Sequence, residues 1–465
     1  MSNTLTPNTP TPNTLRSRLV KGFAAQGFAQ AISLIIQVVS VPLFVHYWGK
    51  FLYGEWLLIS TVPAYFALSD LGFANAAGNE MTMRVGRGDR AGALVVFQSA
   101  WVLVTGLSAA LTMLLLAAVQ LLPIGHWLKL ATLTHAEVTL VATLLILHFF
   151  FDLQASLLGI SYRFDGHFAA GTMIRNTLRL MEFLAGAAVI CLGGHMVALA
   201  LVTIVVRMIG NLLTVLDIRR RSPWLVIGWR HADLVTLKRM LSPALTSMGF
   251  PLGTAFSLQG MVLVVGTLLG PVAVVVFSTS RTLSRFVWQL LTIITNTVWV
   301  ELSTAFGAGD IALARRLHRR TCQAAIWISV PLCLALLASG GVIFRLWTHG
   351  KVPFDPILFG LLLLVVVCNS FWSASYITLM SVNRHQQLAF VYTFATGLSL
   401  VIGVVLTRLI GLHGAALALL VIDAFMSGYV ITRSLRLVQD TLPAFLRSVM
   451  APPSLNPSTS LAEAL

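Results

Sequence analysis

Long apolar runs recur along the whole chain, and each is about 20 residues long or longer. A helix of that length crosses the ~30 Å hydrocarbon core of a bilayer. Only 10% of the residues are charged and 57% are hydrophobic, which is too apolar for a soluble protein. The strands of a membrane barrel would alternate with a period of two, and these runs are continuous. The sequence therefore predicts an all-α polytopic membrane protein.

We predict about 12 transmembrane helices in two pseudo-symmetric six-helix lobes around a central cavity. The expected helices cover residues 20–46, 51–80, 92–121, 136–160, 169–192, 195–217, 242–268, 270–303, 321–346, 355–380, 387–408 and 412–435.

Two stretches of the chain repeat, which supports the division into two lobes. Gly49–Asp89 aligns without a gap to Gly270–Asp310, so that GRGD meets GAGD and Glu80 meets Glu301. Further along each half, HMVALAL at 195–201 corresponds to HGAALAL at 413–419. Because six helices precede the second copy, both halves enter the membrane in the same orientation, which makes a parallel repeat. Two matched lobes of this kind are the basis of rocker-type alternating access.

The domain organisation follows from this repeat and from the polar stretches. A Thr/Pro/Asn-rich N-terminus indicates a disordered tail. The basic stretch between the halves is either an amphipathic helix at the membrane surface or a plain linker. The predicted parts are a tail at 1–18, a lobe at 19–217, a linker at 218–240, a lobe at 241–436 and a cytoplasmic tail at 437–465.

The positive charge is distributed unevenly between the two sides of the predicted topology. The net charge is +15, and most of the Lys and Arg residues lie in connections on the side of the two termini. The opposite side holds Lys50, Lys129, Arg345, Lys351 and Arg408. This is the positive-inside pattern, so we expect both termini to be cytoplasmic. Topology thus explains the basic loops, and we expect no nucleic-acid partner.

Five arginines lie inside the predicted spans and away from their ends, where a charge costs ~2.5–3.5 kcal/mol on insertion scales. Such residues usually face a water-filled pathway or form pairs inside the bundle. Arginine also binds phosphate or carboxylate in a bidentate manner. The candidate substrate-binding residues are Arg175, Arg179, Arg207, Arg281 and Arg285.

Each arginine has a structural alternative. Arg175 is close enough to the cytoplasmic side to snorkel, and Arg179 has Glu182 three residues on as a local ion-pair partner. Arg207 lies near the midplane without an acid within a turn of its own helix, so it needs a partner from another helix or water. Arg281 and Arg285 are one turn apart, again without a nearby acid, and a neighbouring helix could supply one.

Acidic residues also occur inside the spans, and Asp423 is one of them. The candidates for ion coupling are Asp70, Asp152 and Glu182, together with His148, which lies one turn before Asp152. A carboxylate–histidine pair can relay protons. The alternative is that these acids neutralise the arginines, and the sequence leaves both open.

No enzyme signature is present in the chain, and we predict no catalytic residue, metal ligand or cofactor. The four cysteines have no metal-type spacing. GRGD and GAGD lie at helix ends, where glycine is the usual stop signal. A membrane glycan-modifying enzyme, a drug efflux carrier with an acidic cavity and a purely structural scaffold remain as alternatives.

The stretch YGEWLLISTVPAYFALSDLGFANAAGNEMTMRVGRGDRAGA at 53–93 resembles the second-helix region of Wzx-type polysaccharide flippases. QGFAQAISLIIQVVSVPLFVHYWG at 26–49 and SYRFDGHF at 161–168 fit the same family, which belongs to the multidrug/oligosaccharidyl-lipid/polysaccharide exporter superfamily. The resemblance implies a protein of the bacterial inner membrane that translocates a polyprenyl-diphosphate-linked oligosaccharide by alternating access for surface polysaccharide biosynthesis. It also implies membrane lipids and the polysaccharide polymerase machinery as partners.

Overall fold

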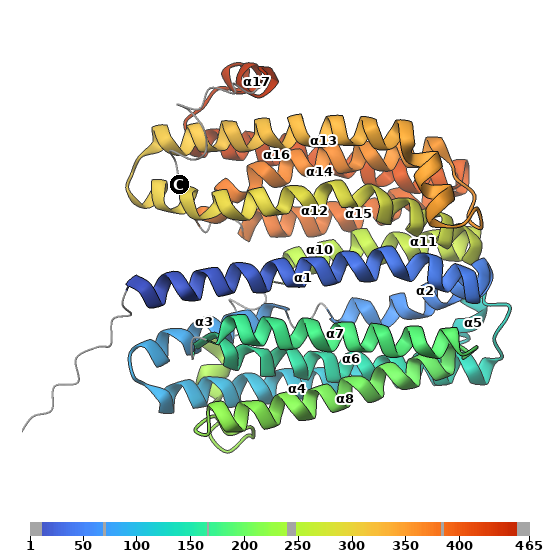
Figure 1. Ribbon diagram of the computed structural model, residues 1–465, viewed down its shortest axis with the longest axis horizontal. Helices are drawn as coiled ribbons and strands as arrows, with labels where there is room; N and C mark the ends of the chain where they lie inside the picture. The colour runs from blue at the N-terminus through green and yellow to red at the C-terminus, as the bar shows by residue number, and fades with distance from the viewer. Residues whose placement is uncertain (1–11, 68–70, 165–166, 240–247, 383–385, 453–465) are drawn as a thin grey trace, which may run out of the picture. The chain divides into compact units, whose positions relative to one another are not determined.

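The computed structural model describes residues 12–67, 71–164, 167–239, 248–382 and 386–452, and within these ranges it contains helices and no strands. Figure 1 shows the helices as long rods that run back and forth along the length of each unit. The helices are α1 (Pro12–Tyr47), α2 (Gly49–Ala67), α3 (Leu71–Gly86), α4 (Arg90–Leu121), α5 (Ile124–Trp127), α6 (His135–Phe164), α7 (Phe168–Cys191), α8 (Met196–Arg221), α10 (Gly249–Ala255), η1 (Phe256–Gly260), α11 (Met261–Leu269), α12 (Pro271–Gly307), α13 (Ile311–Trp347), α14 (Pro356–Ser381), α15 (Gln386–Ile410), α16 (Leu412–Leu437) and α17 (Leu442–Met450).

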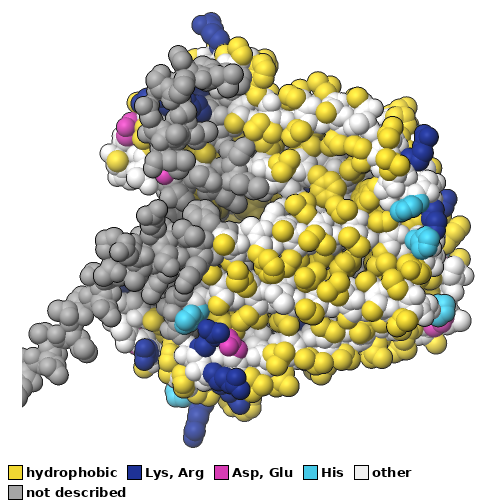
Figure 2. Space-filling view, in the orientation of Figure 1, with side chains coloured by type: hydrophobic (Ala, Val, Ile, Leu, Met, Phe, Trp, Pro, Cys, Tyr) yellow, Lys and Arg dark blue, Asp and Glu magenta, His cyan; other side chains and the backbone are white. Residues whose placement is uncertain are grey.

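The predicted all-α membrane class is confirmed. Nine helices in the described part of the chain are long and apolar enough to cross a membrane. The other three expected spans are also helical: the pair α2 and α3, α7, and α12. On the face drawn in Figure 2, hydrophobic side chains cover the flanks of the helices and most charged side chains lie near helix ends. Many large apolar residues are exposed, among them Leu121 at 81% and Leu192 at 87%, as lipid-facing positions require.

Unit 1 consists of residues 1–47, 66–124 and 133–248. Helix α6 packs against α8, α4 and α3, and α1 packs against α7. The core between these helices is formed by apolar side chains such as Phe97, Leu157 and Leu158, each at most 1% exposed. The alternating apolar and polar faces of the helices therefore enclose a conventional hydrophobic core.

The basic segment after α8 is folded against α4. The Gln98 side chain donates to the Val226 carbonyl at 2.9 Å and accepts from the His231 amide at 2.6 Å. The Ser99 hydroxyl accepts from the Asp233 amide at 2.9 Å. Two buried polar side chains of α4 thus form hydrogen bonds with backbone groups of this segment.

Unit 2 consists of residues 48–65, 125–132 and 249–465. Helix α14 is its central element and packs against α16, α12 and α13, while α15 packs against α16 and α10. Helix α2 belongs to this unit, and Glu55 of α2 accepts from the backbone amides of Ala131 and Thr132 at 2.6 and 2.9 Å. The buried Glu55 carboxylate therefore ties the short loop at 125–132 to α2.

The repeated GRGD and GAGD stretches have the same local structure. Asp89 caps α4 by accepting from the Gly92 amide at 2.7 Å, and Asp310 caps α13 by accepting from the Leu313 amide at 2.8 Å. Gly88 and Gly309 have φ of 79° and 73°, a conformation that favours glycine. The sequence repeat is therefore a structural repeat.

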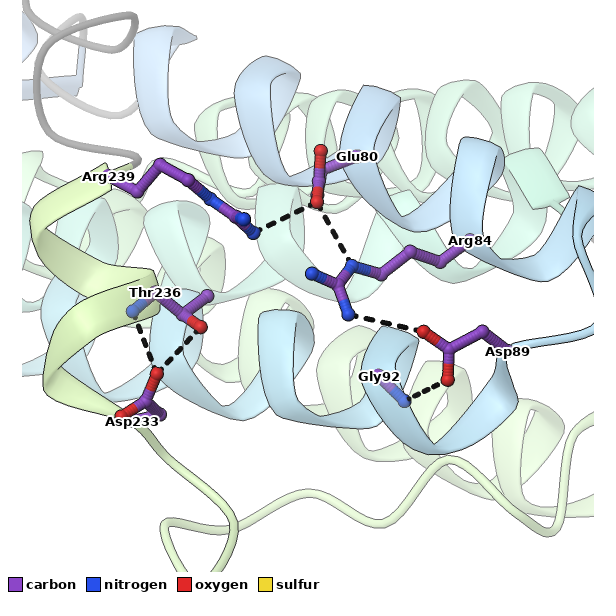
Figure 3. Close-up of polar contacts among 7 residues, drawn as sticks. All are labelled: Glu80, Arg84, Asp89, Gly92, Asp233, Thr236 and Arg239. Carbon is purple, nitrogen blue, oxygen red and sulfur yellow. Dashed lines mark hydrogen bonds and ion pairs between the residues drawn. The ribbon is translucent and has the colours of Figure 1, made fainter.

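Figure 3 shows the polar network around the first copy of the repeat. Arg84 lies between Glu80 and Asp89, with Nε 3.0 Å from Glu80 Oε1 and Nη1 3.2 Å from Asp89 Oδ2. Arg239 contacts the same Glu80 oxygen at 3.0 Å, and Asp233 caps its own turn by accepting from Thr236. Glu80 thus has an architectural role at the end of α3.

Helix α17 is a finding that sequence analysis missed, since it placed residues 437–465 in a tail. Phe445 and Val449 are buried against α13, and the Phe445 ring stacks on His318 with 5.2 Å between centroids. Arg319 Nε donates to Asp440 Oδ2 at 2.7 Å, and Trp327 donates to the Val449 carbonyl at 3.1 Å. These contacts hold the end of the described chain on the outside of α13 (Figure 1).

Candidate functional site

Arg281 of α12 holds a π-helical turn in place. The turn is η1, which interrupts the helix formed by α10 and α11. Arg281 Nη1 donates to the Ser257 carbonyl at 2.9 Å and to the Leu258 carbonyl at 3.4 Å, and Nη2 donates to Ser257 Oγ at 3.1 Å. A π turn disturbs the regular backbone ladder and often marks a functional position. The Arg281 guanidinium therefore joins two helices by satisfying backbone oxygens of the turn.

Arg285, one turn further along α12, lies over the ring of Trp288 with 5.3 Å between Cζ and the ring centroid. Among the described residues it makes no hydrogen bond and no ion pair. Both side chains line a cavity of about 210 Å³ in unit 2, whose walls also include the rings of Trp372, Tyr376 and Tyr392. The buried Trp288 Nε1 finds no acceptor in the described part of the chain. The cavity therefore offers a guanidinium and an indole N–H to a ligand.

Asp423 of α16 lines the same cavity, so the cavity contains both positive and negative side chains. One carboxylate oxygen, Oδ1, accepts from Asn369 Nδ2 at 2.9 Å and from Trp372 Nε1 at 2.8 Å. Asp423 is 9% exposed, and its field acts on both arginines. A neighbouring helix thus supplies an acid opposite Arg281 and Arg285, although no direct ion pair is formed. Sequence analysis missed the aromatic walls, because Trp and Tyr in a span are usually lipid-facing or core residues.

Arg207 of α8 is paired with two acids from neighbouring helices in unit 1. Its Nε lies 2.6 Å from Glu182 Oε1, and its Nη2 donates to Glu182 Oε2 at 2.8 Å. Its Nη1 lies 3.0 Å from Asp152 Oδ1. His148 joins the cluster, with Nε2 3.7 Å from Glu182 Oε1. The structure thus brings together four predicted site residues from α6, α7 and α8, and Arg207 is largely neutralised there.

The remaining predicted residues lie apart from that cluster. Arg179 does not pair with Glu182, because Glu182 faces α8; its Nη1 donates to Ser33 Oγ of α1 at 3.2 Å. Asp70 lies outside the described residues. Arg175 lines a second cavity, of about 220 Å³, in unit 1.

The second cavity was not predicted, and it contains one more arginine than sequence analysis considered. Arg163 at the end of α6, Arg175 of α7 and Arg207 of α8 all line it, together with Thr172 and Tyr162. Sequence analysis treated Arg163 as part of a loop. Among the described residues there is no group of three or more side chains suited to hold a metal ion.

Three comparisons relate this geometry to known proteins. No protein-family model matches the chain, and no curated protein matches it by sequence. Solved structures do match. An inward-facing multidrug resistance transporter of the MATE family in the MOP superfamily is 14% identical, with a TM-score of 0.74, covering 92% of this chain and 99% of that one. Its outward-facing counterpart gives a TM-score of 0.63 at 14% identity over 91% and 96%.

A MOP superfamily transporter from Pyrococcus furiosus, for which a binding pocket of reverse polarity is reported, has a TM-score of 0.63 at 14% identity over 91% and 96%. The chain therefore has the fold of MATE transporters of the MOP superfamily. This is a fold of multi-pass membrane proteins that exists in inward-facing and outward-facing conformations. At these identities the likeness concerns the fold, and the substrate has to be argued from the cavities of this chain.

Proposed function

We propose that this protein is a flippase that carries a polyprenyl-diphosphate-linked oligosaccharide across the bacterial inner membrane by alternating access. Its products would serve surface polysaccharide biosynthesis, with both termini in the cytoplasm. Membrane lipids and the polymerase machinery that extends the glycan would be its partners. The observation that carries the proposal is the cavity of unit 2.

The chemistry of that cavity fits the two parts of such a substrate. The Arg285 guanidinium and the unpartnered Trp288 Nε1 suit the oxygens of a diphosphate. The rings of Trp372, Tyr376 and Tyr392 give flat apolar surfaces with polar edges, as a sugar ring requires. The lower dielectric of a protein interior strengthens each of these contacts relative to the same contact in water.

Arg281 and Arg285 have separate roles in this proposal. Arg281 is bound to the Ser257 and Leu258 carbonyls, so it shapes the cavity. Arg285 lies over an aromatic ring and makes no hydrogen bond or ion pair with any other described residue, so it is the residue available to the substrate. This division makes Arg285 the sharper target for mutation, because its loss does not release the π turn.

The experiment is export of the surface glycan by cells in which a plasmid copy replaces the chromosomal gene. Arg285→Gln should reduce surface glycan at least tenfold and cause the lipid-linked precursor to accumulate on the cytoplasmic side. Arg285→Lys should restore export in part, because the charge returns without the bidentate geometry. Thr282→Val is the matched control on the same helix, since the Thr282 hydroxyl donates to the Ser278 carbonyl and to no other described residue. Normal export by Arg285→Gln at wild-type abundance would refute the proposal.

The second candidate function is efflux of cationic drugs, and Asp423 favours it because a buried carboxylate in the cavity can bind a cation. The two functions respond differently to Asp423→Asn. Loss of drug resistance with intact glycan export in this variant supports the efflux carrier. If Asp423→Asn keeps its drug resistance while Arg285→Gln is defective in glycan export, the flippase is supported.

A further inference from the structure

We propose that α17 is an interfacial helix that binds the anionic phospholipids of the bilayer at the N-terminal end of α13. Its exposed apolar side chains lie among the first carbons of the acyl chains, and the arginines around it contact the headgroups. The proposal concerns how unit 2 is attached to its own membrane, so it holds whichever substrate the protein carries.

The apolar side of α17 is wider than its contact with α13. Phe445 and Val449 are buried against α13, at 0% and 1% exposed. Leu442, Leu446 and Met450 follow one another at a spacing of four residues, and they are 52%, 38% and 72% exposed. Because successive residues lie about 100° apart around a helix, the two sets adjoin and form one apolar arc. We call the exposed set the apolar stripe, and it needs an apolar environment that α13 does not provide.

The contacts of α17 fix its place along α13. The Trp327 indole donates to the Val449 carbonyl at 3.1 Å, and the Gln323 amide donates to the Ala451 carbonyl at 2.8 Å. Both acceptors lie at the end of α17, where the helix cannot satisfy its own carbonyls. Helix α17 therefore lies on the outside of α13 next to residues 318–327 (Figure 1).

This part of α13 is the boundary between headgroups and hydrocarbon. Helix α13 has 37 residues, which extend over about 55 Å at 1.5 Å per residue, whereas the hydrocarbon core needs only ~30 Å. Its first ten residues contain four arginines and so lie outside the hydrocarbon, and the apolar run begins at residue 321. Tryptophan is enriched at this level, and Trp327 is exposed there. An amphipathic helix with an apolar stripe is stable at such a boundary.

The charge around α17 selects anionic lipids. The arginines in the first turns of α13 and in α17 are Arg315, Arg316, Arg319, Arg320 and Arg447. The acids at the start of α13 and just before α17 are Asp310 and Asp440, and residues 453–465 add Glu463 and no Lys or Arg. Positive charge therefore remains in excess even if each of these acids is paired with an arginine. A second copy of the chain would bring the same excess, whereas an anionic leaflet neutralises it.

The test measures amide hydrogen exchange in α17 of the purified full-length protein, in nanodiscs that contain one copy each. One set of nanodiscs consists of phosphatidylcholine, and the other set contains an equal amount of phosphatidylglycerol as well. We expect exchange in α17 of wild type to be at least tenfold slower with phosphatidylglycerol. The difference should shrink as salt rises, because ions screen the contacts with the headgroups. Equal exchange in the two lipid compositions would overturn the proposal.

One variant removes the apolar stripe and leaves the contact with α13. In phosphatidylglycerol nanodiscs, Leu446→Gln/Met450→Gln should exchange at least tenfold faster in α17 than wild type, with unchanged exchange in α14 as evidence that unit 2 stays folded. Leu346→Gln is the matched control, because Leu346 is a 72% exposed leucine at the opposite end of α13, and it should behave as wild type. Wild-type exchange in Leu446→Gln/Met450→Gln contradicts the proposal.

A second variant removes the charge and leaves the apolar stripe. Arg316 and Arg320 lie on the same stripe of α13 as Gln323 and Trp327, at spacings of four, three and four residues, so they are next to α17. Arg316→Gln/Arg320→Gln/Arg447→Gln should exchange at the same rate in both lipid compositions. If this variant still exchanges tenfold more slowly with phosphatidylglycerol, these arginines do not bind the headgroups and the proposal is wrong.

Two further measurements distinguish the lipid from other occupants of the apolar stripe. If α17 of wild type is protected only in nanodiscs that hold two copies, the apolar stripe binds a second copy of the chain. If deletion of residues 453–465 accelerates exchange as much as Leu446→Gln/Met450→Gln does, it binds that segment. Either result overturns the proposal, and neither affects the proposed flippase.

Discussion

Replacing Arg207 with methionine should strongly destabilise unit 1. Arg207 and Glu182 form a close ion pair, and both side chains are only 11% exposed. Methionine preserves much of the side-chain length and removes the charge. Glu182 is then left as a buried carboxylate, and its remaining ion-pair partner among the described residues is His148.

The expected magnitude follows from the burial of the pair. Removing one partner of a buried pair costs ~3–5 kcal/mol, because the other charge stays buried without compensation. For a unit of roughly 200 residues, 1 kcal/mol shifts Tm by about 2–4 °C, so Tm should fall by roughly 6–20 °C. Asp152→Asn should cost about 1 kcal/mol or less, because the Asp152 side chain is 39% exposed and its pairing is screened by water.

A double-mutant cycle measures this effect. The assay is thermal unfolding of purified protein in detergent for Arg207→Met, Glu182→Gln and the combined variant. The combined variant should recover most of the loss, since it removes both members of the pair. Arg220→Met, an exposed position of the same helix, is the control and should change Tm little. If Arg207→Met unfolds at the wild-type temperature, or if the losses simply add, the ion pair does not stabilise unit 1.

Two further predictions concern unit 2. Gly414→Ala should destabilise by about 2 kcal/mol or more, because the new Cβ atom would lie 2.1 Å from the backbone oxygen of Leu406; Gly428→Ala on the same helix meets nothing within 4 Å and should be neutral or stabilising in the same melting assay. Burial would raise the pKa of Asp440, but the hydrogen bonds from Arg319 and the Thr441 amide, together with the charges of Arg319 and Arg315, outweigh it and hold that pKa below its ordinary value. The contribution of this pair is therefore complete above the unfolded pKa of about 3.9 and is lost as pH falls further. Amide hydrogen exchange in α17 of the wild-type protein should accelerate in that pH range. If wild type and Asp440→Asn show the same change with pH, the ion pair does not hold α17 in place.

The helices could be predicted well because hydropathy depends on each span alone. The expected span at 412–435 corresponds to α16, and the expected span at 92–121 to α4. Helix α17 escaped prediction because it has only 9 residues, too few for a periodic pattern to stand out. Its position depends on Phe445 fitting against α13, a contact between segments more than 120 residues apart.

The partners of the buried charges could not be predicted in the same way. Sequence spacing on one helix favoured Arg179 as the partner of Glu182, three residues apart. In the structure, Glu182 contacts Arg207 of α8 instead. The rotation of α7 about its own axis decides between these two arginines, and that rotation is set by packing against α1 and α8. Comparison of the repeats along one chain does not contain this information.

The two halves share the helix caps of the repeat but differ in their buried charges, and the linings of the two cavities show where they differ. Asp89 and Asp310 cap corresponding helices with nearly identical geometry, so the backbone of the repeat is retained. The side chains facing the cavities differ, because unit 2 combines Arg285 with aromatic walls and Asp423, whereas the described lining of unit 1 has arginines without an acid. Retained caps with divergent linings are expected because a cap depends on local backbone geometry, whereas the lining of a cavity depends on side chains from several packed helices.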